Sequence, residues 1–234
     1  MSTVLWPPPA QFALSVNGRR DRAFVNRIFC VGRNYAAHAA EMGHAVEKAA
    51  DRPFYFTKAP HALVASGATI PYPPGTANCH YEMELVVVVG APGFRVPVEA
   101  AAKLVFGYAC GLDLTRRDLQ LALREKGRPW DLGKDFENAA VVSAVQPLPG
   151  TILERGAISL SVNGAVRQRS DLSNMIWGVR EIVADLSLFY HLAPGDLIFT
   201  GTPEGVGPIN PGDRLEGAIE GVGTIALTIG ETPQ

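Results

Sequence analysis

The chain has 234 residues, of which 47% are apolar, so it is long enough to form one sizeable hydrophobic core. Its 21 Lys and Arg residues nearly balance its 23 Asp and Glu residues, and no block of like charge is present. This balance argues against a nucleic-acid-binding or membrane-binding surface and favours a small-molecule partner.

The cysteines and the amino-terminal segment indicate where in the cell the protein resides. Cys30, Cys79 and Cys110 lack the spacing of a metal site, and two of them lie in apolar segments that are typical of reduced, packed thiols. The amino-terminal segment lacks the pattern of a secretion signal, and the longest apolar run is far shorter than the ~20 residues of a transmembrane helix. We therefore expect a cytoplasmic protein.

Short strands dominate the elements that the sequence predicts. Pro7-Pro8-Pro9 indicates an irregular or extended arm, and a turn at Asn17-Gly18 separates two short strands. Residues 1–24 are thus predicted to be an N-terminal extension, and residues 25–234 the main domain. Strand patterns follow at 27–31, 54–57, 68–70, 81–89, 158–162, 197–200, 213–219 and 222–229. Helical patterns cover 34–42, 100–104, 115–126 and 174–191. The predicted fold class is α+β and β-rich, a mixed β-roll or barrel with peripheral helices.

Two glutamates, Glu82 and Glu84, lie at the start of the predicted strand 81–89. Side chains alternate between the faces of a strand, so these two carboxylates share one face. Burying both requires a counter-charge, and we expect a metal ion. Asp113, which follows an apolar segment, is the best third ligand; alternatively it caps the next helix, as Thr115 could also do. Oxygen ligands of this kind suit Mg²⁺ or Mn²⁺.

Three carboxylates around a dication leave one net negative charge, which disfavours an anionic substrate unless a cation lies nearby. Lys134, between Trp130 and Phe136, is the predicted cation, although a solvated loop lysine is the simpler interpretation. The glycine-rich stretch 200–207 lacks the Gly-Lys-Ser/Thr ending of a phosphate loop, so we exclude nucleotide binding. We interpret His61, His80 and His191 as structural.

Seven ordered blocks of the sequence, among them GRNYAAHAAEMG (32–43), HYEMELVVVVG (80–90) and LIFTGTPEGVGPINPGD (197–213), together resemble the fumarylacetoacetate hydrolase family, specifically its small bacterial and mitochondrial members that act on acylpyruvates. The resemblance implies the C-terminal-domain fold of that family, with a mobile lid over about 33–52. It also implies one Mg²⁺ or Mn²⁺ per chain, held by Glu82, Glu84 and Asp113. The blocks are GRNYAAHAAEMG (32–43), PFYFTKAP (53–60), HYEMELVVVVG (80–90), GYACGLDLTRRDLQ (107–120), KGRPWDLGKDF (126–136), VNGAVRQRSDLSNMIW (162–177) and LIFTGTPEGVGPINPGD (197–213).

The same resemblance implies roles for other side chains. Lys134 would hold the substrate, and a dyad of His38 and Glu41 on the lid would activate water, although His38 by itself is typical of a surface histidine. Arg117 and Gln120, which share a helix face at i, i+3, would contact the substrate. Gly201 and Thr202 are expected beside its carboxylate, where a tight turn is the alternative or additional reading, and Arg33 is a further candidate for carboxylate contact. Homodimers are common in the family, and we expect one here.

The expected reaction is metal-dependent hydrolysis of a carbon–carbon bond in a 2,4-dioxo acid. Fumarylpyruvate, giving fumarate and pyruvate in aromatic-compound catabolism, is the leading substrate. Two alternatives use the same site: decarboxylation of oxaloacetate, and isomerisation or decarboxylation of a 2-hydroxyhepta-2,4-diene-1,7-dioate-type acid. An alternative of another class is a non-catalytic β-rich module in which the three acids hold a structural cation.

Overall fold

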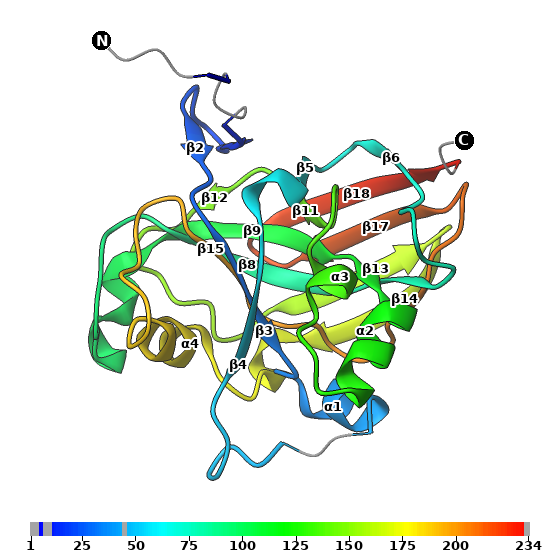
Figure 1. The fold of residues 1–234 in the computed structure, drawn as a ribbon. Helices are drawn as coiled ribbons and strands as arrows, with labels where there is room; N and C mark the ends of the chain where they lie inside the picture. The colour runs from blue at the N-terminus through cyan, green and yellow to red at the C-terminus, as the bar shows by residue number, and fades with distance from the viewer. Residues whose placement is uncertain (1–4, 7–10, 44–45, 232–234) are drawn as a thin grey trace.

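The computed structural model describes residues 5–6, 11–43 and 46–231, and it has the predicted β-rich α+β fold (Figure 1). The arm predicted at Pro7-Pro8-Pro9 lies outside these residues. Across the described part of the chain, no helix combines the length and the apolar content that crossing a bilayer requires.

Two sheets account for most of the described strands. The larger has the order β4-β3-β15-β8-β9-β11-β5, with β12 beside β9, and the other has the order β14-β13-β17-β18-β6. The larger sheet consists of β3 (Ile28–Gly32), β4 (Phe54–Lys58), β5 (Leu63–Ala65), β8 (Met83–Val89), β9 (Val105–Asp113), β11 (Ala140–Val142), β12 (Gln146–Pro147) and β15 (Leu197–Phe199). The second consists of β6 (Thr69–Pro71), β13 (Ala157–Val162), β14 (Ala165–Asp171), β17 (Arg214–Ile219) and β18 (Gly223–Gly230).

Two smaller sheets and the helices complete the described chain. One small sheet joins β10 (Thr115–Arg116), β7 (Cys79–Tyr81) and β16 (Gly207–Pro208), and the other pairs β1 (Ala13–Ser15) with β2 (Arg22–Phe24). Figure 1 shows α1, α2 and α3 gathered on one side of the molecule and α4 on another. The helices are α1 (Ala36–Glu41), α2 (Arg117–Glu125), α3 (Asp131–Lys134) and α4 (Val179–Leu186), with 3₁₀ helices at Pro60–Ala62, Val98–Leu104 and Leu172–Asn174.

Strand β8 is buried on both faces, and each face belongs to a different core. Met83, Leu85 and Val87 join a cluster that includes residues of the five-stranded sheet. Val86 and Val88 point the other way, into a second cluster that includes Leu14 and Val16 from the N-terminal segment. Glu84 shares the period-2 face of Val86 and Val88, so this glutamate extends the second core instead of facing solvent.

The predicted strand 81–89 is interrupted at Glu82. Before this residue, β7 pairs with β10 and β16; after it, β8 pairs with β9 and β15. The chain thus changes sheets at Glu82, which the apolar pattern of the sequence does not reveal.

Two predicted helices are shorter than expected. The helix predicted over 115–126 begins at Arg117, because Thr115 and Arg116 pair with β7 as strand β10. The helix predicted over 174–191 is reduced to α4, since the backbone N–H groups of Ile176 and Trp177 bond to Asn34 instead of continuing a helix.

Asn34, just after β3, is fully buried and joins three segments. Its Nδ2 donates to the carbonyl oxygens of Trp177 at 2.9 Å and Thr200 at 2.8 Å, and its Oδ1 accepts from the Trp177 N–H at 2.8 Å. This side chain therefore ties the end of β3 to the end of β15 and to the segment before α4.

Replacing Asn34 should destabilise the fold far more than replacing an exposed asparagine. Asn34→Ala leaves three buried backbone groups without their partner, so we expect the Tm to fall by on the order of 5 to 10 °C in thermal unfolding followed by circular dichroism. Asn174→Ala is the matched control, because exposed Asn174 has one side-chain hydrogen bond, to Ser170. Equal Tm values for the two variants would contradict this role for Asn34.

Candidate active site

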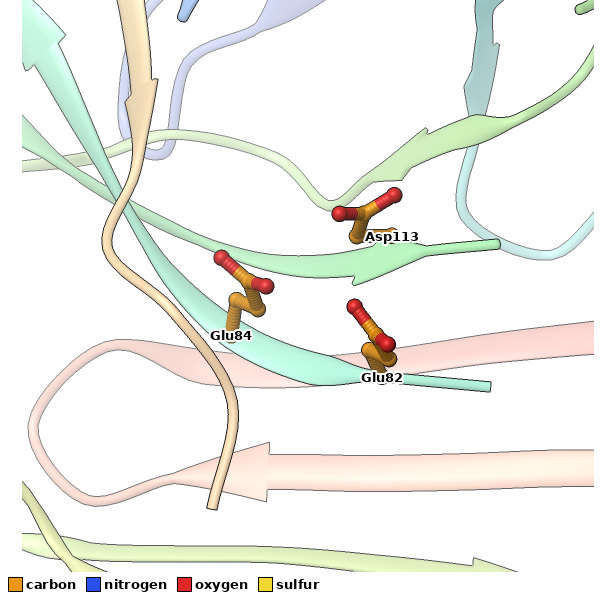
Figure 2. A group of neighbouring side chains, drawn as sticks. All are labelled: Glu82, Glu84 and Asp113. Carbon is orange, nitrogen blue, oxygen red and sulfur yellow. The ribbon is translucent and has the colours of Figure 1, made fainter. Parts of the chain in front are cut away.

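The three predicted metal ligands come together at the ends of neighbouring strands. Met83 pairs with Leu112 and Glu84 with Gly111, and the Asp113 N–H donates to the Glu82 carbonyl at 2.9 Å, so Asp113 lies opposite Glu82. One oxygen of each carboxylate lies within 4.8 Å of the other two. Figure 2 shows the three side chains facing a common space, Glu82 and Glu84 from one segment and Asp113 from the next.

Asp113 ends β9, as the apolar segment before it predicts, and does not cap α2. Thr115 does not cap α2 either: its hydroxyl accepts a hydrogen bond from Lys134 Nζ at 2.7 Å. Both capping interpretations are wrong, because two residues of strand β10 separate Asp113 from the helix.

Lys134 is buried within this acidic group and is not a solvated loop residue. Its ammonium lies 2.7 Å from Glu82 Oε2 and 2.8 Å from Asp113 Oδ2, so it bridges two of the carboxylates. Burial opposes the charge on this lysine, but the carboxylates of Asp113 and Glu82 outweigh that effect and raise its pKa. The cation that the sequence predicts beside the metal ligands is therefore present.

Two further cations balance the acidic group, and sequence reasoning did not assign either as a counter-charge. Fully buried Lys58 lies 2.8 Å from Asp113 Oδ1 and also donates to the backbone carbonyls of Leu114 and Lys134. Arg117 forms a buried ion pair with Glu82. A signal for Lys58 does exist in the sequence, because Phe54, Phe56 and Lys58 alternate along a strand and place the lysine at the end of an apolar face.

The predicted substrate contacts lie close to the acidic group. Arg117 and Gln120 share a face of α2, and Arg117 Nη1 donates to Gln120 Oε1 at 2.5 Å. The Gly201 N–H donates to Glu84 Oε2 at 2.7 Å, and the Thr202 hydroxyl donates to the Met83 carbonyl at 2.8 Å. Gly201 and Thr202 therefore anchor the segment that carries Glu82 and Glu84. The contact of these two loop residues with substrate stays a prediction.

Gly201 can occupy this position because it lacks a side chain. Its φ of +96° is unfavourable for other residues, and a Cβ there would lie 2.7 Å from the Cβ of Asn34. The close approach of the loop to β3 brings the Gly201 N–H to Glu84.

The predicted dyad forms on α1. His38 Nδ1 lies 3.3 Å from Glu41 Oε2, with the imidazole buried and the Glu41 side chain partly exposed. The Gly205 N–H donates to the same Oε2 at 3.3 Å and to Glu41 Oε1 at 3.4 Å. A carboxylate at Nδ1 favours the tautomer whose Nε2 is an acceptor, which suits a general base.

His38 of the dyad, the acidic group and Lys134 line one small inner cavity of about 40 Å³. Gln120, Arg117, Thr202 and Arg33 line it as well. A larger cavity of about 700 Å³ adjoins it and shares Gly32, Arg33, Phe56, Trp130 and Lys134 as wall residues. The inner cavity can thus hold the reacting end of a ligand whose remainder extends into the outer one.

His80, which we interpret from the sequence as structural, places its Nε2 2.9 Å from Asn78 Oδ1. Burial and the nearby charge of Arg117 lower its pKa to about 4, so the ring is neutral at neutral pH. It adds no further positive charge beside Arg117.

The donor set fits a hard divalent cation. Burial, together with repulsion from Asp113 and Glu82, raises the pKa of Glu84 well above its usual value. Burial alone would also raise the pKa of Glu82, but the charges of Lys134 and Arg117 lower it below the usual range. Asp113 Oδ1 is buried, and its partner among the described residues is the ammonium of Lys58, in an ion pair that lacks hydrogen-bond geometry. A dication would favour the ionised form of Glu84 and engage that oxygen, so Glu82, Glu84 and Asp113 could hold Mg²⁺ or Mn²⁺.

Comparison with known proteins identifies the family. The model of the fumarylacetoacetate (FAA) hydrolase C-terminal family matches residues 27–230. A fumarylpyruvate hydrolase of Ralstonia sp. is 58% identical over 189 residues, which cover 81% of this chain and 98% of that protein. A mitochondrial oxaloacetate tautomerase of Homo sapiens is 40% identical over 210 residues, covering 88% of this chain and 92% of that protein.

A solved structure has nearly the same fold. The fumarylpyruvate hydrolase from Pseudomonas aeruginosa, in complex with Mn²⁺ and pyruvate, superposes with a TM-score of 0.92 at 46% identity, covering 98% of this chain and 100% of that one. With the family model covering most of the chain, the sequence blocks and the acidic group have one explanation: this chain belongs to the fumarylacetoacetate hydrolase family.

Proposed function

We propose that this protein is a metal-dependent hydrolase that cleaves the carbon–carbon bond of an acylpyruvate, converting fumarylpyruvate and water to fumarate and pyruvate. The observation that carries the proposal is one cavity lined by three buried carboxylates, Lys134 and His38, whose imidazole pairs with Glu41. The likeness to fumarylpyruvate hydrolases supports the choice of substrate.

Charge balance favours an anionic keto acid at this site. Lys58, Lys134 and Arg117 already offset the three carboxylates in the metal-free protein. A divalent cation bound by Glu82, Glu84 and Asp113 would supply Lewis acidity and would leave the cluster with two positive charges. The carboxylate and 2-oxo group of a 2,4-dioxo acid match that excess charge.

The dyad activates the water molecule that attacks the substrate. His38 accepts a proton from water at Nε2, while Glu41 holds Nδ1 and stabilises the imidazolium. The oxygen of that water attacks the 4-carbonyl carbon, and a tetrahedral intermediate forms. When it collapses, the bond between C3 and C4 breaks, which releases fumarate and leaves the electron pair on the pyruvate fragment as its enolate.

Lys134 stabilises the charge that develops on the pyruvate fragment, because its ammonium is fixed by Glu82, Asp113 and Thr115 before the reaction begins. Proton return from His38 to C3 completes the turnover and restores the neutral base. Decarboxylation of oxaloacetate would form the same enolate but needs no attacking water, so the dyad favours hydrolysis.

The remaining sequence-based expectations belong to this proposal. We infer that the protein acts as a cytoplasmic homodimer, with residues 25–234 as the catalytic domain and a lid over about 33–52. Its three cysteines are buried thiols, which suits a reducing compartment. The exposed apolar side chains of Phe94, Leu188 and Phe189 offer a surface that a second copy could cover.

Replacing His38 should separate hydrolysis from decarboxylation. In Mn²⁺-loaded protein, His38→Ala should lower kcat for fumarylpyruvate by on the order of 10²- to 10⁴-fold, since general-base catalysis is lost, while any oxaloacetate decarboxylation falls much less. Both rates can be followed by coupling pyruvate to lactate dehydrogenase.

The matched control is His61→Ala, because His61 is exposed and lines neither of the two cavities. A folded His38→Ala variant with full fumarylpyruvate activity would refute the dyad. Wild-type protein that decarboxylates oxaloacetate but leaves fumarylpyruvate intact would refute the hydrolase.

Lys58 should contribute more to the stability of the metal-free protein than to that of the metal-loaded protein. Lys58→Met removes one of the two cations paired with buried Asp113, so the Tm of the metal-free protein should fall by on the order of 10 °C. Added Mn²⁺ replaces the missing positive charge, so it should raise the Tm of the variant by more than that of the wild type.

Differential scanning calorimetry with and without Mn²⁺ measures both effects. Lys126→Met, at an exposed lysine just after α2, serves as the control. A Mn²⁺ shift in Lys58→Met that is equal to or smaller than the wild-type shift would contradict the account of the charge balance.

A further inference from the structure

Arg33 has a strained backbone at the junction of the two cavities. Its φ of +59° lies in the left-handed region, which is unfavourable for any residue except glycine. The next residue, Asn34, is fixed by its three buried hydrogen bonds, and this anchor maintains the conformation of Arg33. Strain of this kind persists where the surrounding structure imposes it, and it is common at ligand sites.

The strained backbone directs the Arg33 guanidinium into an aromatic corner. The guanidinium carbon lies 5.9 Å from the ring centroid of Phe54 and 5.9 Å from that of Trp130. Gly32 makes room for this corner, because a Cβ there would lie 2.6 Å from Phe54 Cδ1. Aromatic faces hold a guanidinium without neutralising it, and Arg33 forms no salt bridge with any described residue, so its hydrogen-bond donors stay available to an anion.

Arg124, near the end of α2, lines the same inner cavity as Arg33. Arg117, Gln120 and Arg124 follow one another at i, i+3 and i+7 along one face of α2, and all three line that cavity. Arg124 also donates from Nη1 to the Met42 carbonyl at 3.4 Å, which links α2 to the segment after α1. Burial and the charge of Arg124 lower the pKa of Arg33, and the charge of Asp51 offsets this only in part, so the two arginines destabilise one another across the cavity.

The wall of the outer cavity carries charges of both signs. Four cationic side chains face two acidic ones, but Arg52 is paired with Asp185, and Lys134 with Glu82 and Asp113, so Arg33 and Arg128 are the wall cations without an ion pair among the described residues. The charged wall residues are Arg33, Arg52, Arg128 and Lys134, against Asp51 and Asp131.

We propose that Arg33 and Arg124 bind the terminal carboxylate of the acyl group, so that the enzyme selects acylpyruvates whose acyl chain ends in a carboxylate. This inference rests on the proposed function. The keto-acid end of the substrate occupies the acidic group and Lys134, and the scissile carbonyl faces His38. The inner cavity is too small for the whole molecule, so the acyl chain extends to the junction with the outer cavity, where Arg33 lines both cavities and Arg124 lines the inner one. An anion between the two guanidiniums relieves their repulsion.

The aromatic side chains of the corner provide the opposing hypothesis. If Phe54, Phe56 and Trp130 bind a neutral, apolar acyl group, the two arginines contribute little to the choice of substrate. The two hypotheses differ in how much a terminal carboxylate on the acyl group contributes to substrate binding.

The experiment compares a carboxylate-ended substrate with a neutral one. Wild type, Arg33→Gln, Arg124→Gln and the control Arg169→Gln are each assayed with fumarylpyruvate and acetylpyruvate in the presence of Mn²⁺. Gln keeps the same backbone strain at position 33, and Arg169 is an exposed arginine of β14 that lines neither cavity. The ratio of kcat/KM for fumarylpyruvate to that for acetylpyruvate should fall on the order of 10- to 100-fold in both site variants and stay unchanged in the control.

A binding measurement keeps this test independent of catalysis. Isothermal titration of Mn²⁺-loaded protein compares fumarate with crotonate, which has a methyl group in place of the second carboxylate. Wild type should prefer fumarate, and the preference should fall on the order of 10-fold or more in Arg33→Gln and Arg124→Gln.

The two measurements test the proposed reaction and the proposed anion subsite separately. If wild type does not cleave fumarylpyruvate but its fumarate preference disappears in the variants, the proposed reaction is wrong and the anion subsite is supported. If wild type cleaves fumarylpyruvate while the ratio and the preference are unchanged in both variants, the subsite is refuted. Equal binding of fumarate and crotonate to wild type refutes it as well.

Discussion

The burial of three carboxylates beside one another is the constraint on which the site depends. Glu82, Glu84 and Asp113 are each at most 5% exposed, and a carboxylate in such surroundings is costly unless opposite charge is close. The protein supplies that charge from three directions, with Lys58 on β4, Lys134 on α3 and Arg117 on α2. Segments that are distant in sequence must therefore pack at this point for the acidic group to be stable.

This cluster links folding to chemistry. Lys134 bridges Glu82 and Asp113, and its own backbone carbonyl accepts a hydrogen bond from Lys58. The side chain that would stabilise an enolate is thus held by the same contacts that stabilise the fold. Such prior fixation reduces the reorganisation that charge development would otherwise require.

The sequence predicts the centre of the site better than its surroundings. The i, i+2 spacing of Glu82 and Glu84 and the apolar segment before Asp113 correctly indicate that these side chains meet, although the strand is broken at Glu82. The break escapes sequence reasoning because it depends on which strands lie on either side of the chain. The start of α2 is misjudged for the same reason, since Thr115 pairs with His80 across the small sheet.

Counter-charges and cavity walls depend even more on tertiary contacts. Lys58 lies in a block that the sequence singles out, yet its partner Asp113 is 55 positions away, and no local pattern links them. His38 and Glu41, by contrast, are one helical turn apart, so helix geometry alone predicts that they meet. Contacts within an element can be read from spacing, whereas contacts between elements require the topology.

The position of Asn34 has a consequence for how this scaffold can diversify. It fixes the end of β3 to Thr200, next to Gly201, whose N–H holds Glu84, so the chain up to this residue belongs to the rigid body that shapes the acidic group. The stretch beyond α1 touches that body through surface ion pairs, Lys48 with Glu181 and Arg52 with Asp185. Residues 47–52 can consequently be exchanged, lengthened or reshaped as an interchangeable module, while the acidic group and the His38–Glu41 dyad are inherited intact.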